Sequence, residues 1–479
     1  MTPDDRARRP SERAGADPDA HAGHGASPAR DGDVIPFRTA VRAWFGISLQ
    51  TFGGPAGQIA VMQRALVDER RWIGQRRFQH ALNYCMLLPG PEAHQLAIYV
   101  GWLLNGFRGG VAAGVLFVLP GLVALLVLSA VYVGLGDTTV VSAVFAGLGA
   151  AVVGIVVQAV TRIAARAFTH PLLVGLSVAA FLALAVFGVP FPVVVAVAAV
   201  IGWLAARRIP ALTRSRPSDT DDGPAPLIAD EALHHEAPSG RRTLRTLVLG
   251  LVVWLLPVAV AALTTGVASV YTAQGLFFAG TALVTFGGAY AVLAFVAQQA
   301  VQAFGWLTAG DMVRGLALAE TTPGPLIIVV QFVAFLGAYA DPGPLSPWTA
   351  GVVASLLVAW VTFVPSFLFI FLGAPYIERV RDNRALTGAL TGITAAVVGV
   401  IANLAVYFAT STLFARTVTV DDGPLTLHLP DLTTLRPVTL ALVVVGALLV
   451  FAARWPVLRV LGVCAALGLA AGVAGLPVA

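Results

Sequence analysis

Charged residues are scarce in this chain. Only 11% of its 479 residues are charged, 57% are hydrophobic, and the mean hydropathy is +0.82. Because water-soluble domains carry about 25% charged residues, the composition excludes a soluble protein. All 30 basic residues are arginine and none is lysine. We assign the net charge of +5 to orienting a protein in the lipid bilayer rather than to binding nucleic acid, because basic loops stay in the cytoplasm.

The sequence also lacks the residue patterns of common catalytic and metal sites. Its two cysteines, Cys85 and Cys464, have no metal-ligand spacing and support no disulfide framework. No His-Glu-x-x-His, Cys-x-x-Cys, Gly-x-Ser-x-Gly or nucleotide-binding Walker sequence occurs. We therefore expect no enzyme, no direct drive by ATP, no bound metal and no other cofactor.

Two polar stretches divide the chain. Residues 1–34 mix Ala, Gly, Pro and both signs of charge without an apolar core, which is typical of a disordered cytoplasmic tail. Residues 207–245 indicate a cytoplasmic linker. This division predicts a first membrane repeat at 35–206, a connecting transmembrane helix at 246–268 and a second membrane repeat at 269–479.

The two halves repeat each other. Thr-Phe-Gly-Gly occurs at 51–54 and 285–288, Trp72 matches Trp306, and Pro-Gly-Pro occurs at 89–91 and 323–325, all at an offset of 234 residues. Further on, Ala-Ala-Val-Val-Gly recurs at an offset of 245 residues, as does the proline that precedes it. Matches in register over this length indicate a duplicated unit.

The apolar segments predict an all-α membrane protein. A helix needs about 20 residues to cross a hydrocarbon core of about 30 Å. Nine plain spans meet or approach this length, at 109–133, 139–161, 170–187, 190–206, 246–268, 347–372, 386–410, 436–453 and 456–475.

Arginine distribution predicts that the two repeats are inverted in the membrane. Basic connections in one half have nearly uncharged counterparts in the other. The positive-inside rule places the basic ones in the cytoplasm, and they are 64–77, 161–167, 207–245 and 378–384. The extra span at 246–268 is what turns a second copy upside down. The fold class predicted is thus two inverted-topology repeats, about nine plain spans plus four broken or re-entrant helix pairs.

The remaining segments cannot cross the membrane and must turn back. Residues 78–105 begin and end beside arginines, and the next span leaves from that same side, so the chain turns at Pro89-Gly90-Pro91. The same reasoning makes 311–340 a hairpin that turns at Pro323-Gly324-Pro325. Shallow re-entrant loops and full-depth helix pairs both satisfy this parity. Non-helical backbone at membrane depth must be buried by protein or line a cavity.

Inverted repeats with broken helices are typical of secondary transporters, which hold the substrate near the midplane between the repeats. Pro55, Pro91 and Pro325 suit the first turn of returning half-helices, whose N–H groups would favour an anion. A plain kink or close-packing role for each motif is the alternative. The residues expected to line the anion site are Gly53, Gly54, Pro55, Pro89, Gly90, Pro91, Glu92, His94, Gly287, Gly288, Thr321, Thr322, Pro323, Gly324 and Pro325.

Several of these side chains have two interpretations. Glu92 is either a protonatable group that couples proton and anion occupancy or an acid that complements its helix dipole. His94 is either a proton relay or a histidine packed between helices. The hydroxyls of Thr321 and Thr322 bond either an oxyanion or their own backbone. A further set of arginines either attracts dianions at the cytoplasmic mouth or only fixes topology: Arg64, Arg71, Arg76 and Arg77.

These motifs together resemble the chromate ion transporter family, in its long form with two homologous halves of opposite orientation. The resemblance rests on FGGP followed by a basic loop, LPGPEAHQLA, GGVAAGVLFVLPG at 109–121, and in the second half FGG, Trp and TPGPL. It implies export of chromate from the cytoplasm, with sulfate as the isosteric competitor, driven by the membrane potential or the proton gradient. The second half departs from the family's commoner FGGG and following proline, because it has Ala289 and Ala294.

Other functions remain open at this point. A transporter of sulfate or another tetrahedral oxyanion is the main alternative, and an anion channel shares the same anion-friendly helix ends. The expected location is the inner (plasma) membrane, with several spans. A homodimeric assembly is left open by the sequence.

Overall fold

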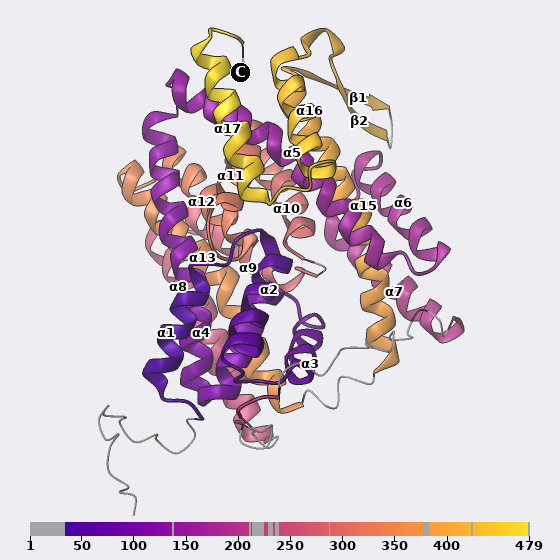
Figure 1. Cartoon of the computed structure of the whole chain (residues 1–479). Coiled ribbons are helices and arrows are strands. Elements are labelled where there is room, and N and C mark those ends of the chain that lie inside the picture. Colours follow the sequence, from indigo (N-terminus) through magenta and orange to yellow (C-terminus); the bar gives the residue numbers. More distant parts are fainter. Residues whose placement is uncertain are drawn as a thin grey trace, which may run out of the picture.

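The computed structural model describes residues 34–136, 138–209, 212, 225–228, 233–234, 239–286, 288–376, 383–422 and 425–477. All but the last residue of the predicted tail at 1–34 and most of the linker at 207–245 therefore lie outside the described residues. Within the described part the chain is almost wholly helical (Figure 1). Its one sheet there is a hairpin of β1 (Thr417–Asp422) and β2 (Leu425–Pro430). The prediction of an all-α membrane protein is confirmed.

The first half contains seven α-helices and one π-helical segment in its described residues. They are α1 (Phe37–Ser48), α2 (Gly54–Gln63), the π-helix η1 (Arg64–Glu69), α3 (Gln75–Cys85), α4 (Glu92–Leu135), α5 (Thr139–Ala167), α6 (Pro171–Ala185) and α7 (Phe191–Arg208).

The second half begins after the connecting helix α8 (Gly240–Thr265). Its elements are α9 (Val270–Leu283), α10 (Ala289–Gln298), the π-helix η4 (Gln299–Ala303), α11 (Ala309–Thr321), η5 (Leu326–Ile328), α12 (Val329–Ala340), α13 (Pro347–Gly373), η6 (Ala374–Tyr376), α15 (Arg384–Leu413), η7 (Leu432–Thr434), α16 (Pro437–Phe451) and α17 (Val457–Val473).

Each of the nine predicted spans corresponds to a helix, although several extend a few residues beyond its ends. Six helices of the described chain are long and apolar enough to cross a membrane: α4, α5, α7, α8, α13 with η6, and α15. The other three predicted spans are shorter, because α6 and α16 have 15 residues and α17 has 17. At about 1.5 Å per residue these three reach roughly 23–26 Å, a little less than the hydrocarbon thickness.

The helices of the broken pairs are half as long as a span. The arms α1, α2, α3, α9, α11 and α12 have between 10 and 14 residues. Arms of that length reach roughly 15–21 Å, against a hydrocarbon core of about 30 Å. With the η segments that continue them, however, 54–69 and 326–340 are as long as α6 and α16, so re-entrant hairpins and full-depth pairs both remain predictions. α4 also contains such an arm, because the backbone leaves helical geometry at Asn105 and Gly106.

The two halves repeat the same order of elements, including an irregular one. Each second arm ends in a π-helical turn closed by matching hydrogen bonds. The Trp72 N–H donates to the Leu66 carbonyl oxygen at 2.8 Å, and the Trp306 N–H donates to that of Ala300, also at 2.8 Å. These four residues are related by the sequence offset of 234. The repeat therefore extends from the motifs to backbone hydrogen bonding.

The halves are interlocked, because the last helix of each packs against the other half. α7 lies along α15, and α17 lies along α5. A Cβ added to Gly202 of α7 would lie 2.3 Å from the Gly388 carbonyl oxygen, and one added to Gly468 of α17 would lie 2.4 Å from that of Ala143. Glycine at both crossings lets the backbones approach this closely.

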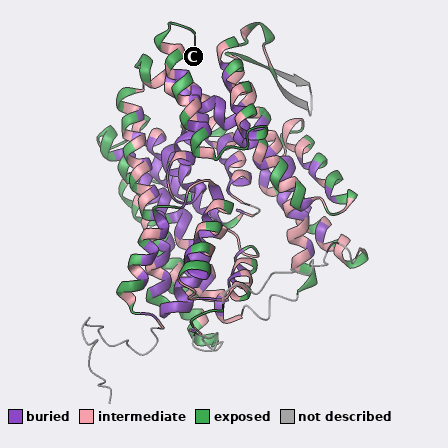
Figure 2. Cartoon of the chain, viewed as in Figure 1, coloured by how far each residue is buried: buried purple, intermediate pink, exposed green. Residues whose placement is uncertain are grey.

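Helix α8 has no counterpart in the first half and lies on the outside. Only Trp254 and Val258 of its side chains are buried. It is attached to α13 by two reciprocal bonds: the Trp254 indole N–H donates to the Val361 carbonyl oxygen (2.8 Å), and that of Trp360 donates to the Val253 carbonyl oxygen (2.9 Å). Its remaining apolar surface suits a lipid environment, as the exposed face of α8 in Figure 2 indicates.

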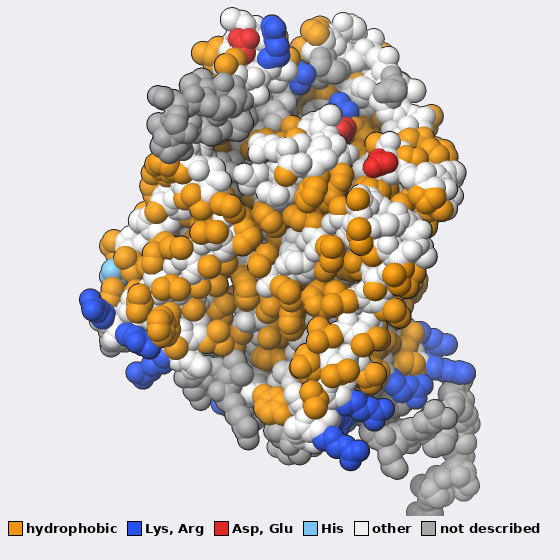
Figure 3. Space-filling view, turned by 180° about the vertical axis from the view of Figure 1, so that it is seen from behind, with side chains coloured by type: hydrophobic (Ala, Val, Ile, Leu, Met, Phe, Trp, Pro, Cys, Tyr) orange, Lys and Arg blue, Asp and Glu red, His pale blue; other side chains and the backbone are white. Residues whose placement is uncertain are grey.

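The molecular surface has a broad apolar belt with charge at its two ends. Figure 3 shows hydrophobic side chains over the middle of the molecule and most of the visible arginines at its lower end. In Figure 1 the arms α1 to α3 lie in the lower part and α10 to α12 in the upper part. This arrangement agrees with opposite orientations of the two halves. That the halves are inverted across a membrane stays a prediction.

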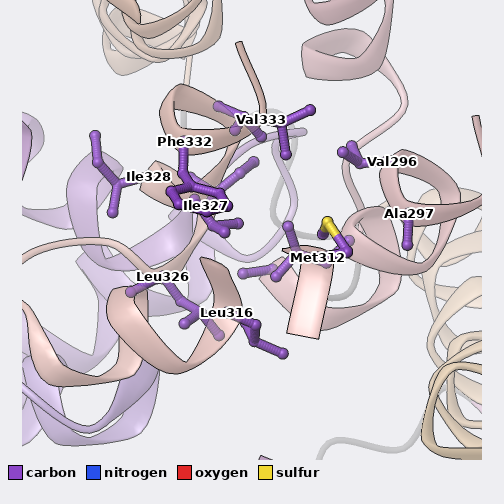
Figure 4. Packing of buried hydrophobic residues seen from close by; sticks show 14 of the residues in the cluster. Val296, Ala297, Met312, Leu316, Leu326, Ile327, Ile328, Phe332 and Val333 are labelled. Atoms are coloured by element: carbon purple, nitrogen blue, oxygen red, sulfur yellow. The ribbon is translucent and has the colours of Figure 1, made fainter. Parts of the chain in front are cut away.

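Buried apolar side chains hold the half-helices of the second half together. Figure 4 shows the close packing of aliphatic side chains from α10, α11 and the η5–α12 segment around Phe332. The labelled residues include Val296, Met312, Leu316, Leu326, Ile327, Ile328 and Val333. This packing positions the start of η5, which belongs to the site described next.

Candidate functional site

The four chain breaks meet at the centre of the molecule through a reciprocal pair of hydrogen bonds. The Gly90 N–H donates to the Thr285 carbonyl oxygen at 2.8 Å, and the Gly324 N–H donates to the Thr51 carbonyl oxygen at 2.9 Å. The offset of 234 residues converts one bond into the other. Reciprocal contacts of this kind are what a two-fold relation between two units produces. Each Pro-Gly-Pro turn thus contacts the Phe-Gly-Gly turn of the other half.

The turns have a backbone geometry that favours glycine. Gly90 has φ +124° and Gly324 has φ +107°, values that side chains of L-residues rarely allow. At Gly90 an added Cβ would also lie 2.7 Å from the Gln95 side-chain nitrogen. Glycine at both positions therefore allows the two turns to share this backbone geometry.

A small cavity lies where four helices begin. Its volume is about 10 Å³, and it is bounded by the starts of α2, α4, α10 and η5. Its lining consists of Pro55, Gln58, Pro91, Glu92, Ala93, Ala289, Pro325, Leu326 and Ile327. Helix starts carry free N–H groups and the positive end of the helix dipole, so their convergence favours an anion. The prediction that the motifs aim helix starts toward a shared interior agrees with this geometry.

The cavity is small in this structure. A cavity of about 10–15 Å³ on this measure accommodates a single water. A tetrahedral oxyanion, which has four oxygens around its central atom, requires more room. Binding such an anion therefore requires the four turns to move apart, and the reciprocal hydrogen bonds between the halves are the contacts that such a movement would break.

Glu92 is the first residue of α4 and lines the cavity. Its Oε2 atom is buried and has no hydrogen-bond partner among the described residues. The position at the start of a helix suits a carboxylate, because the positive end of the dipole stabilises negative charge. Nothing in the described structure separates the two interpretations of Glu92, which both remain predictions.

His94 lies two residues after Glu92 and is fully buried. Its ring lies 5.2 Å from that of Phe363, 5.3 Å from that of Phe367 and 6.3 Å from that of Phe117, between centroids. Neither ring nitrogen has a hydrogen-bond partner in the part of the chain described. This apolar surrounding favours a packed neutral histidine over a proton relay, because a relay needs hydrogen-bonded neighbours.

Two glutamines stabilise the turns. The Gln58 side-chain NH₂ donates to the Gly324 carbonyl oxygen at 2.5 Å and so connects α2 with the turn of the second half. The Gln95 side-chain NH₂ donates to the Pro89 carbonyl oxygen at 2.6 Å within the first hairpin. Buried carbonyl groups without partners are costly in a membrane protein, and these bonds satisfy two of them.

The threonines before the second turn bond their own helix. The Thr321 hydroxyl donates to the Leu318 carbonyl oxygen at 2.7 Å, and the Thr322 hydroxyl donates to that of Ala319 at 2.9 Å. Of the two interpretations of Thr321 and Thr322, oxyanion bonding or backbone bonding, this structure shows backbone bonding. Pro323 contributes differently, because its carbonyl oxygen faces Gly121 of α4 at close range.

The glycine motifs precede the other two helix starts. Gly53 and Gly54 have φ +79° and +73° and lead into α2, with Pro55 in its first turn. Gly288 has φ +100° and precedes α10. Gly287 lies outside the described residues.

The four arginines expected at the cytoplasmic mouth do not form one cluster of free side chains. Arg64 and Arg76 are exposed, whereas Arg77 is half-buried at the start of α3. The Arg71 guanidinium donates to the carbonyl oxygen of Ala225 in the linker. Arg71 therefore holds the linker against the first half, a role that its sequence context did not indicate.

Two polar groupings escaped the sequence analysis. Tyr290 donates to the carboxylate of the buried Glu320 at 2.5 Å. Tyr132 bonds Asp311 and accepts from Arg314 at 2.9 Å. Each grouping joins two helices that are far apart in the sequence, so the sequence alone did not show that these side chains meet. For Glu320, the presence of an acid in an apolar arm was the one feature of the sequence that could have indicated a functional residue.

Comparison with known proteins agrees with this arrangement. The family model described as "Chromate transporter" matches residues 39–203 and 272–469, which correspond to the two halves. A chromate transport protein of Pseudomonas aeruginosa is 33% identical over 360 residues, covering 74% of this chain and 76% of its own length. A chromate transport protein of Cupriavidus metallidurans is 28% identical, covering 75% and 79%. A probable chromate transport protein of Synechococcus elongatus is 28% identical, covering 74% and 80%. No solved structure gives a significant match.

Proposed function

Because the chain belongs to the chromate transporter family, we propose that it is a secondary transporter that exports chromate from the cytoplasm across the inner membrane. Chromate is a tetrahedral divalent oxyanion, and relatives named for its transport match about three quarters of the chain. Export of this kind would give the cell resistance to chromate. A transporter of this class carries out no chemical conversion of its substrate.

The convergence of four helix starts on one cavity carries the proposal. Two starts come from each half, at Pro55 and Pro91 in the first and at Ala289 and Pro325 in the second. Free N–H groups at a helix start donate hydrogen bonds to oxyanion oxygens, and the dipoles offset part of the charge. Sites at the interface of two repeats are typical of secondary transporters.

The reciprocal hydrogen bonds contribute to the energy needed to open the site, together with the Gln58–Gly324 bond between the halves. Each of the bonds Gly90–Thr285 and Gly324–Thr51 contributes about 0.5–1.5 kcal/mol net, so separating both costs roughly 1–3 kcal/mol. A bound dianion that accepts hydrogen bonds from the released N–H groups offsets this cost. Alternating access then requires one half to move against the other, with the anion between them.

The membrane potential favours export of a dianion. Moving one charge across 100 mV is worth about 2.3 kcal/mol, so two negative charges gain about 5 kcal/mol on leaving a cell that is negative inside. We place the end with the exposed Arg64 and Arg76 in the cytoplasm, following the positive-inside rule. The inverted orientation of the two halves belongs to this proposal.

Labelled anion uptake into everted membrane vesicles tests the proposal. The cytoplasmic face of such vesicles is outermost, so export appears as uptake. We expect chromate to accumulate when the lumen is positive, and an ionophore that removes the membrane potential to abolish accumulation. Chromate accumulation that survives collapse of both gradients would refute secondary transport. Sulfate uptake without chromate uptake would instead support the sulfate transporter that the sequence left open.

Replacement of Glu92 by Gln tests the coupling role of the acid in the cavity. If Glu92 exchanges a proton during transport, Glu92→Gln flattens the pH dependence of chromate uptake, because the amide cannot titrate. If Glu92 only complements its helix, the variant lowers the rate or the stability but keeps the pH profile of the wild type. A profile unchanged in shape therefore assigns Glu92 to the helix start alone.

A further inference from the structure

The second half carries a buried acid that the central cavity does not contact. Glu320 is 2% exposed and lies in the last turn of α11, just before the second Pro-Gly-Pro turn. The Tyr290 hydroxyl donates to its Oε1 atom at 2.5 Å. A carboxylate buried inside a membrane protein is expensive to keep, so it calls for an explanation.

No basic side chain forms an ion pair with Glu320 among the described residues. Arg314 lies on the same helix, but it donates to Tyr132, which also bonds Asp311. The groups that act on Glu320 from neighbouring helices are Tyr290 of α10 and, electrostatically from a greater distance, Arg162 of α5. The exposed Arg162 donates to Gln158 on its own helix. The carboxyl group therefore has one neutral hydrogen-bond donor and no neutralising partner in contact.

The position of Glu320 on its helix disfavours the charged form. The last turn of a helix carries the negative end of the dipole, which repels a carboxylate. Burial away from water acts in the same direction. Glu92 has the opposite placement, because it is the first residue of α4, at the positive end. When the environments of two acids differ in this way, one acid can exchange a proton while the other stays charged.

The Glu320–Tyr290 pair is connected through the chain to two residues that line the central cavity. Tyr290 follows Ala289, which lines the cavity at the start of α10. Glu320 connects through the second turn to Pro325, which lines it at the start of η5. The hydrogen bond thus joins α10, whose start lines the cavity, to the end of α11, which leads through the second turn to η5.

The pair has no equivalent in the first half. At the offset of 234 residues Met86 stands in place of Glu320, and Ala56 stands in place of Tyr290. Conversely, Leu326 stands in place of Glu92. Each half therefore supplies one acid, at a different point of the repeated unit.

We propose that Glu320, held by Tyr290, is a proton-binding site, and that the central cavity takes up a divalent oxyanion only when Glu320 is protonated. Uptake of one proton converts the carboxylate to a neutral carboxyl group and removes one negative charge from behind the anion site. This inference rests on the proposed oxyanion transport. It goes beyond it by stating that proton and anion bind together, since an ionised Glu320 repels the dianion and thermodynamic linkage makes the effect reciprocal.

Binding of chromate and of sulfate to the purified full-length protein at a series of pH values tests the proposal. Above the titration midpoint of Glu320, the apparent Kd of the wild type rises about tenfold per pH unit, because the competent fraction falls tenfold. Glu320→Gln is isosteric and always neutral, so its Kd stays low and flat. Tyr290→Phe removes the only donor to the charged form and moves the midpoint to higher pH.

Glu69→Gln is the matched control, because Glu69 is an exposed acid whose substitution makes the same chemical change. It should keep the wild-type pH profile. Because chromate itself changes protonation with pH, measuring this control in the same buffers shows how much of the profile comes from the anion rather than from the protein. A Glu320→Gln variant with the wild-type profile overturns the proposal. If that variant does not fold, an unshifted midpoint in Tyr290→Phe overturns it equally.

Infrared spectroscopy separates this inference from the proposed function. A protonated carboxyl group gives a carbonyl stretch that a carboxylate lacks, and the signal needs no bound anion. We expect a pH-dependent carbonyl band in the wild type and in Glu69→Gln that is missing in Glu320→Gln. If the wild type binds no oxyanion at any pH, the proposed function fails while the band still tests the proton site. If oxyanions bind but the band is unchanged in Glu320→Gln, the proton site fails alone.

Discussion

Replacing Gly121 by Ala is predicted to force the first half away from the turn of the second. Gly121 lies on α4, and a Cβ added there would be 2.3 Å from the carbonyl oxygen of Pro323. Ordinary contact begins at 3.4 Å, so the backbone of the turn must move by about 1.1 Å. Because the obstacle is a backbone atom, no side-chain rotation relieves the overlap. The displaced turn carries Gly324, whose N–H bonds Thr51 across the halves.

The expected effects of this substitution differ in size for stability and transport. Overpacking of this kind costs about 1–3 kcal/mol of stability. A displacement of about 1 Å at a site that requires close geometry lowers rates by roughly 100-fold, so chromate uptake should suffer more than folding does. Thermal unfolding in detergent measures the first effect, and uptake into everted vesicles measures the second.

Gly134→Ala on the same helix is the control for Gly121→Ala. The nearest atom to an added Cβ there is in the Trp348 side chain at 3.7 Å, an ordinary contact. This control should be neutral or stabilised by up to about 1 kcal/mol, since alanine favours the helix. If Gly121→Ala matches Gly134→Ala in stability and transport, the close crossing of α4 and the second turn is refuted.

Three further substitutions have expected outcomes. Gln58→Leu leaves the Gly324 carbonyl without its donor and should lower the stability in detergent by about 1–3 kcal/mol; unchanged unfolding would contradict the bond. Thr322→Val should change the chromate concentration for half-maximal uptake less than about twofold, because the hydroxyl already bonds its own helix; a tenfold rise would make Thr322 an anion ligand. Arg71→Gln should speed hydrogen exchange at 225–228, where it contacts Ala225, and equal exchange in the two proteins would argue against that contact.

Much of the fold was predictable because the signals are local. Apolar length identifies a span wherever it occurs, and Pro-Gly-Pro interrupts a helix wherever it stands. The nine spans and the breaks at 89–91 and 323–325 therefore agree with the structure. The lengths of α6 and α16 were overestimated by a few residues, because apolar loop residues extend the hydropathy signal beyond the helix ends.

The candidate site was predictable only in part. Pro55, Pro91, Glu92 and Pro325 line the cavity. Pro91 and Pro325 belong to the repeated Pro-Gly-Pro, and Pro55 and Glu92 directly follow repeated motifs. Ala289 lines the cavity at the start of α10, the fourth helix start. It stands where the first half has Pro55, so no repeated proline marked it in the sequence. The roles suggested for side chains were less certain, because a hydroxyl or an imidazole reveals its partners only when other helices pack around it.

The sequence alone determined that this is a membrane protein of two related halves with interrupted helices, since composition, hydropathy and repeats need no tertiary contact to be recognised. The tertiary structure decided which turns meet. It pairs Gly90 with Thr285 and Gly324 with Thr51, and it places Tyr290 against Glu320. These pairs join residues far apart in the chain, and their contact depends on how entire helices pack, which no local pattern encodes.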